Sequence, residues 1–199
     1  MSNINGKAYG MTAITPVPKL QTWKVRLFLE GLSVIKPLET DLAQLSFIHF
    51  ARWIIIPADG FPQVSDFQPR ERLEYDYVLF MSNFNGTWDQ YIDAFGAVLG
   101  HGLAGIWGTS INYPVHGTIT PIKAYIDNVQ FATDYYFSAY PGATATDTQN
   151  ARIVQDAFDE ISSLAEHLTP EQFQETYLQF VLKVQAHLGQ TGPTELCFN

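Results

Sequence analysis

Residues that can transfer protons or line a ligand pocket recur on two segments of strand-like composition. His49 lies in "FIHFARWIII" (47–56), and Tyr77 lies in "YDYVLFMSNF" (75–84). An imidazole titrates near neutral pH and can move a proton in either direction, so His49 is the candidate acid/base and Tyr77 a second proton-handling group. Aromatic and polar side chains that could line an apolar pocket around them are Trp53, Met81, Asn83, Trp107 and Thr109.

The alternation of side chains along a strand groups these candidates. Residues two apart in a strand share a face, and "IWGTSINY" (106–113) has the composition of a further strand. We predict that one open sheet face carries His49, Trp53, Tyr77, Met81, Asn83, Trp107 and Thr109. The sequence therefore predicts an aromatic-lined pocket for a small apolar or aromatic ligand.

A second interpretation of the same face stays open. Its aromatic side chains could form a dimer interface, or a core beneath the C-terminal segment, with His49 hydrogen-bonded in a structural role. Arg52 falls on the opposite face of its segment, where a charge needs a carboxylate partner, and Asp89 or Asp93 could supply it. We predict a structural ion pair between Arg52 and Asp89.

Other motifs are less informative. "GHGLAG" (100–105) matches G-x-G-x-x-G in letters, but it follows a helical pattern instead of opening one, as a dinucleotide site requires. The remaining histidines lack the spacing of a metal site, so no metal ligands are predicted. No serine sits in a nucleophile elbow.

Hydrophobic periodicity indicates the elements that must position the candidates. The segment "KAYGMTAITPVP" (7–18) favours an edge strand, and residues 19–45 favour a helical crossover interrupted at Pro37. Residues 57–74 carry three prolines and form a surface connection. Thr87 and Gln90 match a capping box that opens an amphipathic helix, ended by "GHGLAG".

The C-terminal part adds further elements. We predict a short helix near 121–128, a strand at "DYYFSAYP" (134–141), a helix opened by a capping box of Thr146 and Gln149, and a last helix beginning at Thr169. The domain prediction is a plait with an added strand over residues 1–142, and a helical extension over 143–199 packed on the same domain.

The order strand, helix, strand, strand, helix, strand predicts an α+β fold, the ferredoxin-like plait, with an extra strand and C-terminal helices. In such a plait one sheet face packs on helices. The other face is open and needs a partner sheet, an extension or a ligand to cover it.

The segments "FIHFARWIIIP", "VLFMSNFNGTWDQYIDAF", "GIWGTSINYP" and "YYFSAYP" resemble an uncharacterised group in the dimeric α/β-barrel superfamily, which includes dye-decolourising peroxidases and chlorite dismutases. The resemblance spans roughly residues 7 to 165 and implies a homodimer. It also implies haem as one cofactor, with a histidine as axial ligand. The peroxidases carry Gly-x-x-Asp-Gly, whereas "IPADG" has Ile56 in place of the first glycine.

Composition narrows the partners. With 199 residues, 46% of them hydrophobic, the chain can bury a sizeable core. A formal net charge of -9 and only 11 Lys and Arg disfavour nucleic acid and anionic membranes. The N-terminus lacks a signal-peptide pattern, no apolar run is long enough to span a membrane, and the single cysteine, Cys197, excludes an internal disulfide. These features predict a cytoplasmic protein.

Three function classes therefore stay open. The first is a small-molecule-binding protein or enzyme that uses the open-face pocket. The second is a non-catalytic homodimeric interaction protein, and the third a haem-dependent peroxidase-like protein.

Overall fold

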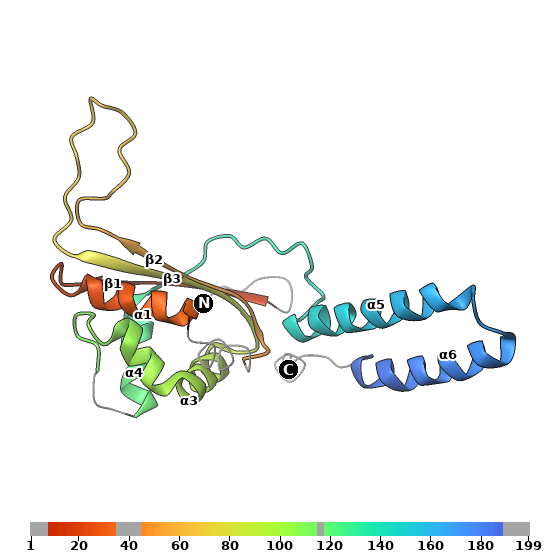
Figure 1. The fold of residues 1–199 in the computed structure, drawn as a ribbon. Helices are drawn as coiled ribbons and strands as arrows, with labels where there is room; N and C mark the ends of the chain where they lie inside the picture. Colours follow the sequence, from red (N-terminus) through yellow and green to blue (C-terminus); the bar gives the residue numbers. More distant parts are fainter. Residues whose placement is uncertain (1–7, 35–44, 115–117, 189–199) are drawn as a thin grey trace.

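The computed structural model describes residues 8–34, 45–114 and 118–188 (Figure 1). Its elements are β1 (Ala8–Val17), α1 (Thr22–Val34), β2 (Ile48–Ile56), β3 (Asp76–Asn85), α3 (Trp88–Trp107), α4 (Ile119–Val129), β4 (Gln130–Phe131), α5 (Ala145–Ala165), α6 (Pro170–Val184) and the 3-10 helix η1 (Gln185–His187). The helical interruption predicted at Pro37 lies outside the described residues.

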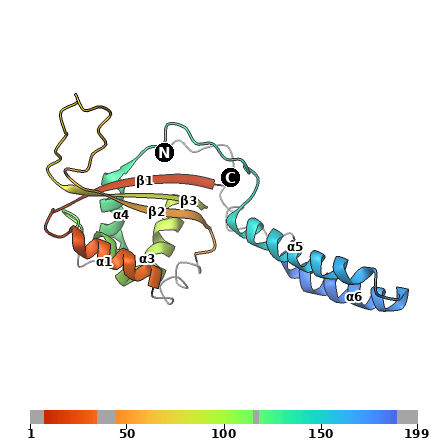
Figure 2. The same ribbon diagram turned by 45° about the horizontal axis from the view of Figure 1, so that its top comes forward.

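Four strands form one antiparallel sheet in the order β2-β3-β1-β4. Helices α1, α3 and α4 cover one face of this sheet, and none of the described helices covers the opposite face (Figures 1 and 2). The predicted mixed α+β class is confirmed. We call the helix-covered side the helix face and the other side the open face.

Side-chain alternation on the two central strands explains why the sheet packs on that side. In β1, Met11, Ala13 and Val17 are buried, and in β3, Val78 and Phe80 are buried, each two residues or a multiple of two from the next. Their neighbours on the open face are half-buried. The core therefore lies between the helix face and the helices.

Helix α3 begins where the sequence predicts and ends later. The Thr87 side chain accepts the Gln90 backbone N–H, and the Gln90 side chain accepts the Thr87 N–H, which confirms the capping box. The helix then continues through "GHGLAG" to Trp107, so the predicted strand over 106–113 is wrong. Its last turns stay helical because Leu103, Ile106 and Trp107 continue the buried stripe.

One glycine in α3 serves packing and does not terminate the helix. A Cβ at Gly105 would lie 2.5 Å from Cδ2 and 2.7 Å from Cζ of Phe28 in α1. The two helices pack against each other at this glycine. Gly105, read from the sequence as part of a helix end, therefore allows α1 and α3 to approach closely.

The predicted strand over 134–141 is also wrong. The fourth strand is the two-residue β4, which pairs with β1 through Thr12 and Phe131. The chain after it has no regular secondary structure up to α5. It runs along the open-face side of the sheet towards α5 (Figure 1).

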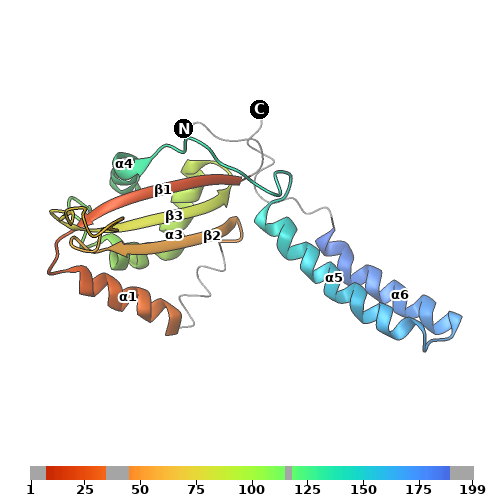
Figure 3. The same cartoon turned by 90° about the horizontal axis from the view of Figure 1, so that it is seen from above.

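Helices α5 and α6 with η1 form a helical hairpin that we call the arm. A capping box opens α5 at Thr144 and Asp147, two residues before the predicted pair, and Thr169 with Gln172 opens α6 as predicted. The arm was expected to pack on the α/β body, but it projects away from the sheet (Figures 2 and 3).

Candidate functional site

The open face presents an extended apolar surface. β2 contributes Phe50 and Ile54, which are 74% and 37% exposed. The ladder places Ile54 beside Leu79 of β3, and Leu79 beside Ile14 of β1. Phe131 of β4 is 58% exposed on the same face. All four strands thus contribute apolar side chains to a sheet face that is not covered by any helix of the described residues.

The segment between β4 and α5 covers one end of this face. The Asn83 side-chain amide donates to the Tyr136 hydroxyl at 2.9 Å. A Cβ at Gly10 would lie 3.0 Å from Cδ2 of the Tyr136 ring, so glycine leaves room for that ring on β1. Thr133 donates to the Gly10 carbonyl at 3.4 Å. Asn83 is on the open face as predicted, and it binds another part of the chain.

Arg52 also lies on the open face, contrary to the prediction. It pairs with Met81 in the ladder, and its Nη2 lies 3.6 Å from the Met81 sulfur. Asp89 and Asp93 of α3 bind Lys123 of α4 instead, at 3.0 and 2.9 Å. The predicted Arg52–Asp89 pair is therefore wrong, because the two side chains lie on opposite sides of the sheet.

Trp53 belongs to the core. It pairs with Phe80, its ring centroid lies 5.1 Å from that of Phe80, and it packs against the buried cluster. The alternation of side chains along β2 was predicted correctly, but its two sets of residues were assigned to the wrong faces of the sheet. The Trp53 ring buries its large apolar area against the core, while the exposed edge strand tolerates Arg52 in solvent.

His49 and Tyr77 are too far apart to act on one proton. His49 occupies the extra position of a β-bulge, since Ile48 pairs with Phe84 and Phe50 pairs with Asn83. Tyr77 pairs with Ile56 at the other end of the same ladder, roughly 20 Å away at about 3.3 Å per residue. The predicted catalytic pair is therefore not assembled.

His49 lies in a partly buried environment that does not adjoin a ligand pocket among the described residues. Its Nε2 is buried without a hydrogen-bond partner. Burial lowers the pKa of His49 below its ordinary value, and the neighbouring Asn85 side chain opposes that shift. None of the hollows found among the described residues is lined by His49.

Trp107 and Thr109 do not join the open face. Trp107 is the last residue of α3, 5% exposed, with its ring perpendicular to that of Phe80 at 5.3 Å. Thr109 lies in the turn after α3, and its hydroxyl is buried without a hydrogen-bond partner. Both belong to the helix side of the sheet because α3 extends through the position of the predicted strand.

A buried group of hydroxyls is the most polar part of the core. Ser110 donates to Thr15 at 3.3 Å, and Thr15 donates to the Val78 carbonyl at 3.5 Å. Burial raises the pKa of Tyr125 to about 12, and the neighbouring Ser110 and Thr15 hydroxyls oppose the shift. Since none of the hollows among the described residues is lined by Thr15 or Ser110, this group joins β1 to the helices and offers no ligand access.

Asn85 has a role that sequence reasoning missed. Its side chain is 2% exposed and accepts the Ala145 backbone N–H at 2.8 Å. This bond joins the end of β3 to the first residue of α5. Gly86 has a φ of 93°, so the chain turns directly after Asn85, but a contact 60 residues away in the chain has no local signal.

The described residues do not fit a haem. A hollow of about 450 Å³ lies on the arm and is lined by residues such as Phe158 and His187. It has walls from α5 and the chain after α6 alone, and the His187 Nδ1 lies 3.1 Å from the Asn150 side-chain oxygen. A haem needs an axial ligand inside a pocket that encloses the macrocycle. Neither this histidine nor His49 provides one.

No group of three or more His, Cys, Asp or Glu side chains in the described part of the chain is arranged to hold a metal ion. None of the described helices combines the length and the apolarity needed to cross a membrane.

Comparison of the chain with protein-family models, with curated proteins and with solved structures finds no match in any of the three.

Proposed function

We propose that this chain is a non-catalytic homodimeric interaction protein, and that its open sheet face packs on the same face of a second copy. The observation that carries the proposal is the exposed apolar surface of that face, to which Phe50 and Ile54 contribute on one edge strand and Phe131 on the other. Contiguous exposed apolar surface on a folded domain is typical of interaction sites. A flat sheet face also suits another sheet better than a small molecule.

The strand order supports a finer fold assignment. Read from β4, the order is β4-β1-β3-β2, with antiparallel neighbours and helices on one face. We propose that this is a ferredoxin-like plait with a short last strand and α4 inserted before it. That topology agrees with the resemblance to the dimeric α/β-barrel superfamily, in which the open face is a dimer contact. The single cysteine supports a cytoplasmic location.

The decisive experiment places a charge on the open face, on its edge strand β2. Phe50→Glu adds a carboxylate at a side chain that is 74% exposed, so the monomer should still fold. Phe67→Glu is the matched control, because Phe67 is 98% exposed on the connection between β2 and β3. Sedimentation equilibrium at micromolar concentration should show that Phe50→Glu halves the molar mass of the assembly and that Phe67→Glu leaves it unchanged.

Two results would contradict the proposal. A wild-type chain that sediments as a monomer at this concentration has no such interface. An assembly whose mass is unchanged by Phe50→Glu uses another surface.

Small-molecule binding to the same face is a second candidate, favoured by Arg52. Its guanidinium is exposed on this face beside the apolar side chains of Phe50, Ile54 and Met81, which suits an aromatic carboxylate. Naphthoate should then raise the melting temperature of the wild-type chain but not of Arg52→Met. Equal shifts in the two proteins, or none in either, would exclude this site.

A further inference from the structure

The hollow of about 450 Å³ lies at the base of the arm, where α5 begins and η1 ends. Pockets that bind small molecules commonly have volumes of about 300 to 1,000 Å³, so this hollow has the size of a ligand site. Phe158 and Leu188 line it and are 54% and 58% exposed, which shows that it is open to solvent. A ligand can therefore enter it without displacing the helices.

One row of side chains on α5 gives the hollow a polar end and an apolar end. At about 100° per residue, Asp147, Val154 and Phe158 lie within about 20° of one line along the helix. At about 1.5 Å per residue, Val154 lies about 10 Å from Asp147 along that line, and Phe158 about 16 Å. His187 and Leu188 line the same hollow from η1. A ligand that fills it must be polar at one end and apolar at the other.

The polar end offers hydrogen-bond acceptors. The Asp147 Oδ2 accepts the Thr144 backbone N–H at 2.8 Å, and a carboxylate has two oxygens with about four lone-pair sites. The His187 Nδ1 lies 3.1 Å from the Asn150 Oδ1, which can only accept, so this ring nitrogen carries the hydrogen. In the neutral ring the Nε2 is then a further acceptor. Both side chains therefore suit a ligand group that donates hydrogen bonds.

The charge of Asp147 is not neutralised within the described part of the chain. None of the ion pairs between described residues includes it, and no Lys or Arg side chain among them lines the hollow. The first turn of a helix carries about half a positive charge, which the full charge of a carboxylate outweighs. The polar end of the hollow is therefore negative.

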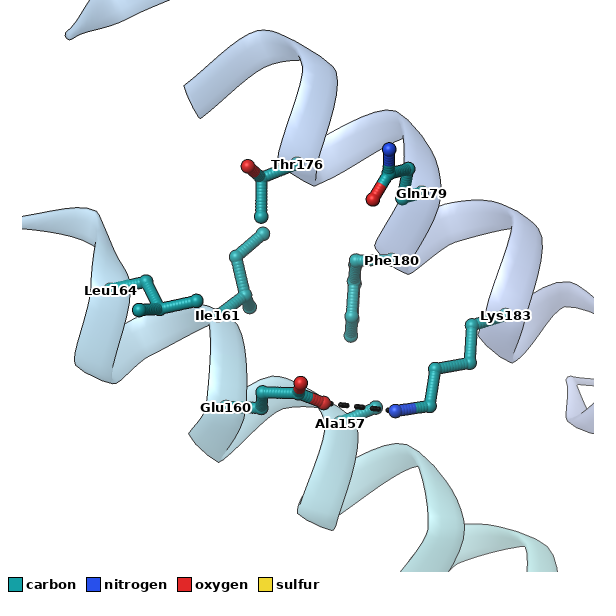
Figure 4. Close-up of a pocket in the computed structure, with 8 residues that line it drawn as sticks. All are labelled: Ala157, Glu160, Ile161, Leu164, Thr176, Gln179, Phe180 and Lys183. Atoms are coloured by element: carbon teal, nitrogen blue, oxygen red, sulfur yellow. Dashed lines mark hydrogen bonds and ion pairs between the residues drawn. The ribbon is translucent and has the colours of Figure 1, made fainter. Parts of the chain in front are cut away.

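A second pocket of the arm differs in this respect. Figure 4 shows this pocket, of about 130 Å³, where Ile161 of α5 and Phe180 of α6 lie between the two helices. Its carboxylate belongs to Glu160, which binds Lys183 at 2.9 Å. The negative charge there already has a cationic partner, so this pocket does not call for a charged ligand.

We propose that the hollow at the base of the arm binds an amphipathic amine, with its ammonium group at Asp147 and its apolar part against Val154 and Phe158. An ammonium group donates three hydrogen bonds and no lone pair, which matches acceptors at the polar end. Its hydrogen bond to a carboxylate is charge-assisted and is stronger than one between neutral groups. The apolar part of the amine covers side chains that are otherwise exposed to water.

The charge of the arm selects an amine over an acid. Residues 145–188 contain seven Asp or Glu and two Lys or Arg, and the whole chain has a formal net charge of -9. Such a field raises the local concentration of cations and lowers that of anions. A neutral ligand of the same shape gains the apolar contacts without the ion pair, and therefore binds more weakly than the amine.

Three compounds of similar shape and different charge test this selection. They are phenylbutylamine, phenylbutanol and phenylbutyrate, and NMR titration of the backbone amides of residues 145–158 measures the dissociation constant of each at the arm. The amine should bind at least about tenfold more tightly than the alcohol, and the acid more weakly than the alcohol. The proposal is overturned if the amine does not bind, or if amine and alcohol bind equally.

Two variants of α5 test the role of Asp147. Asp147→Asn removes the charge and keeps the cap, because an amide oxygen also accepts the Thr144 N–H. Asp156→Asn is the matched control, since it removes the same charge nine residues later, at about 180° around the helix. Asp147→Asn should weaken amine binding by at least about tenfold without changing alcohol binding, and Asp156→Asn should weaken amine binding by less than about twofold. Equal losses in the two variants would contradict a specific contact with Asp147.

The position of the ligand can be measured without any substitution in the arm. Nuclear Overhauser effects should connect the phenyl protons of the bound amine to the methyl groups of Val154 and Leu188. Effects to methyl groups of the sheet in their place would contradict the assignment. Phe50→Glu should leave amine binding unchanged, because the hollow includes no residue of the open face. The amine site and the proposed dimer interface can therefore fail separately.

Discussion

Asn85→Ala is expected to destabilise the fold and loosen the attachment of the arm. The Asn85 side chain is almost completely buried and accepts the backbone N–H of Ala145, itself 5% exposed, at 2.8 Å. The substitution leaves that donor buried without an acceptor, which costs about 1–3 kcal/mol. Removing the amide also leaves a small cavity beside His49, so we expect a loss in the upper half of this range.

Asn83→Ala is the matched comparison. Asn83 lies two residues earlier on the same strand and donates to the Tyr136 hydroxyl at 2.9 Å, but that contact is only partly buried. Water can replace the lost partner, so the expected cost is about 0.5–1 kcal/mol. The difference between the variants thus measures burial and not the number of hydrogen bonds.

Urea unfolding followed by tryptophan fluorescence measures both free energies. Hydrogen exchange of the Ala145 amide, read by NMR, should accelerate in Asn85→Ala and not in Asn83→Ala. Equal costs for the two substitutions would refute the reasoning. So would an Ala145 amide that exchanges as slowly in Asn85→Ala as in the wild type.

Three further predictions concern packing and pH. Gly105→Ala should lower the melting temperature despite its higher helix propensity, because the added methyl overlaps the Phe28 ring, whereas Gly142→Ala, with nothing within 4 Å, should be near neutral. Below about pH 6.5 the free energy of unfolding should fall as the pH falls, because His49 has a lower pKa in the folded state and is therefore protonated first in the unfolded state. In urea unfolding measured at several pH values, His49→Gln should weaken this dependence on pH. Above about pH 10 the free energy of unfolding should fall again, by up to about 1.4 kcal/mol per pH unit, because burial raises the pKa of Tyr91 in the folded state. A Tyr91→Phe variant whose free energy of unfolding falls equally steeply above about pH 10 would contradict this assignment.

Local patterns predicted much of the architecture. The first strand and the β3 segment were placed to within a residue or two, because apolar alternation and flanking prolines are local properties. The capping box at Thr87 was found because its reciprocal hydrogen bonds join residues three positions apart, and the start of the last helix was placed at Thr169. The class of fold followed from the order of these elements.

The candidate site was predicted poorly, because its residues had to be assigned to a face. Period-two alternation divides β2 into two sets without saying which set meets the helices, and one inversion moved Trp53 and Arg52 to the wrong sides. The bulge at His49 is similarly a property of the pairing with β3 and leaves no mark in the sequence of β2.

The sequence by itself determined the periodicity of the strands and helices, the starts of α3 and α6 and the acidic, single-cysteine composition, since each depends on residues close together in the chain. Tertiary structure alone decided which side of β2 is buried, that Gly105 lies inside a helix, and that Asn85 holds the start of α5. These outcomes depend on contacts between distant segments, where burial of large rings and satisfaction of buried amides outweigh local preference. The same contacts leave the open face exposed, and so define the surface on which a second copy is proposed to pack.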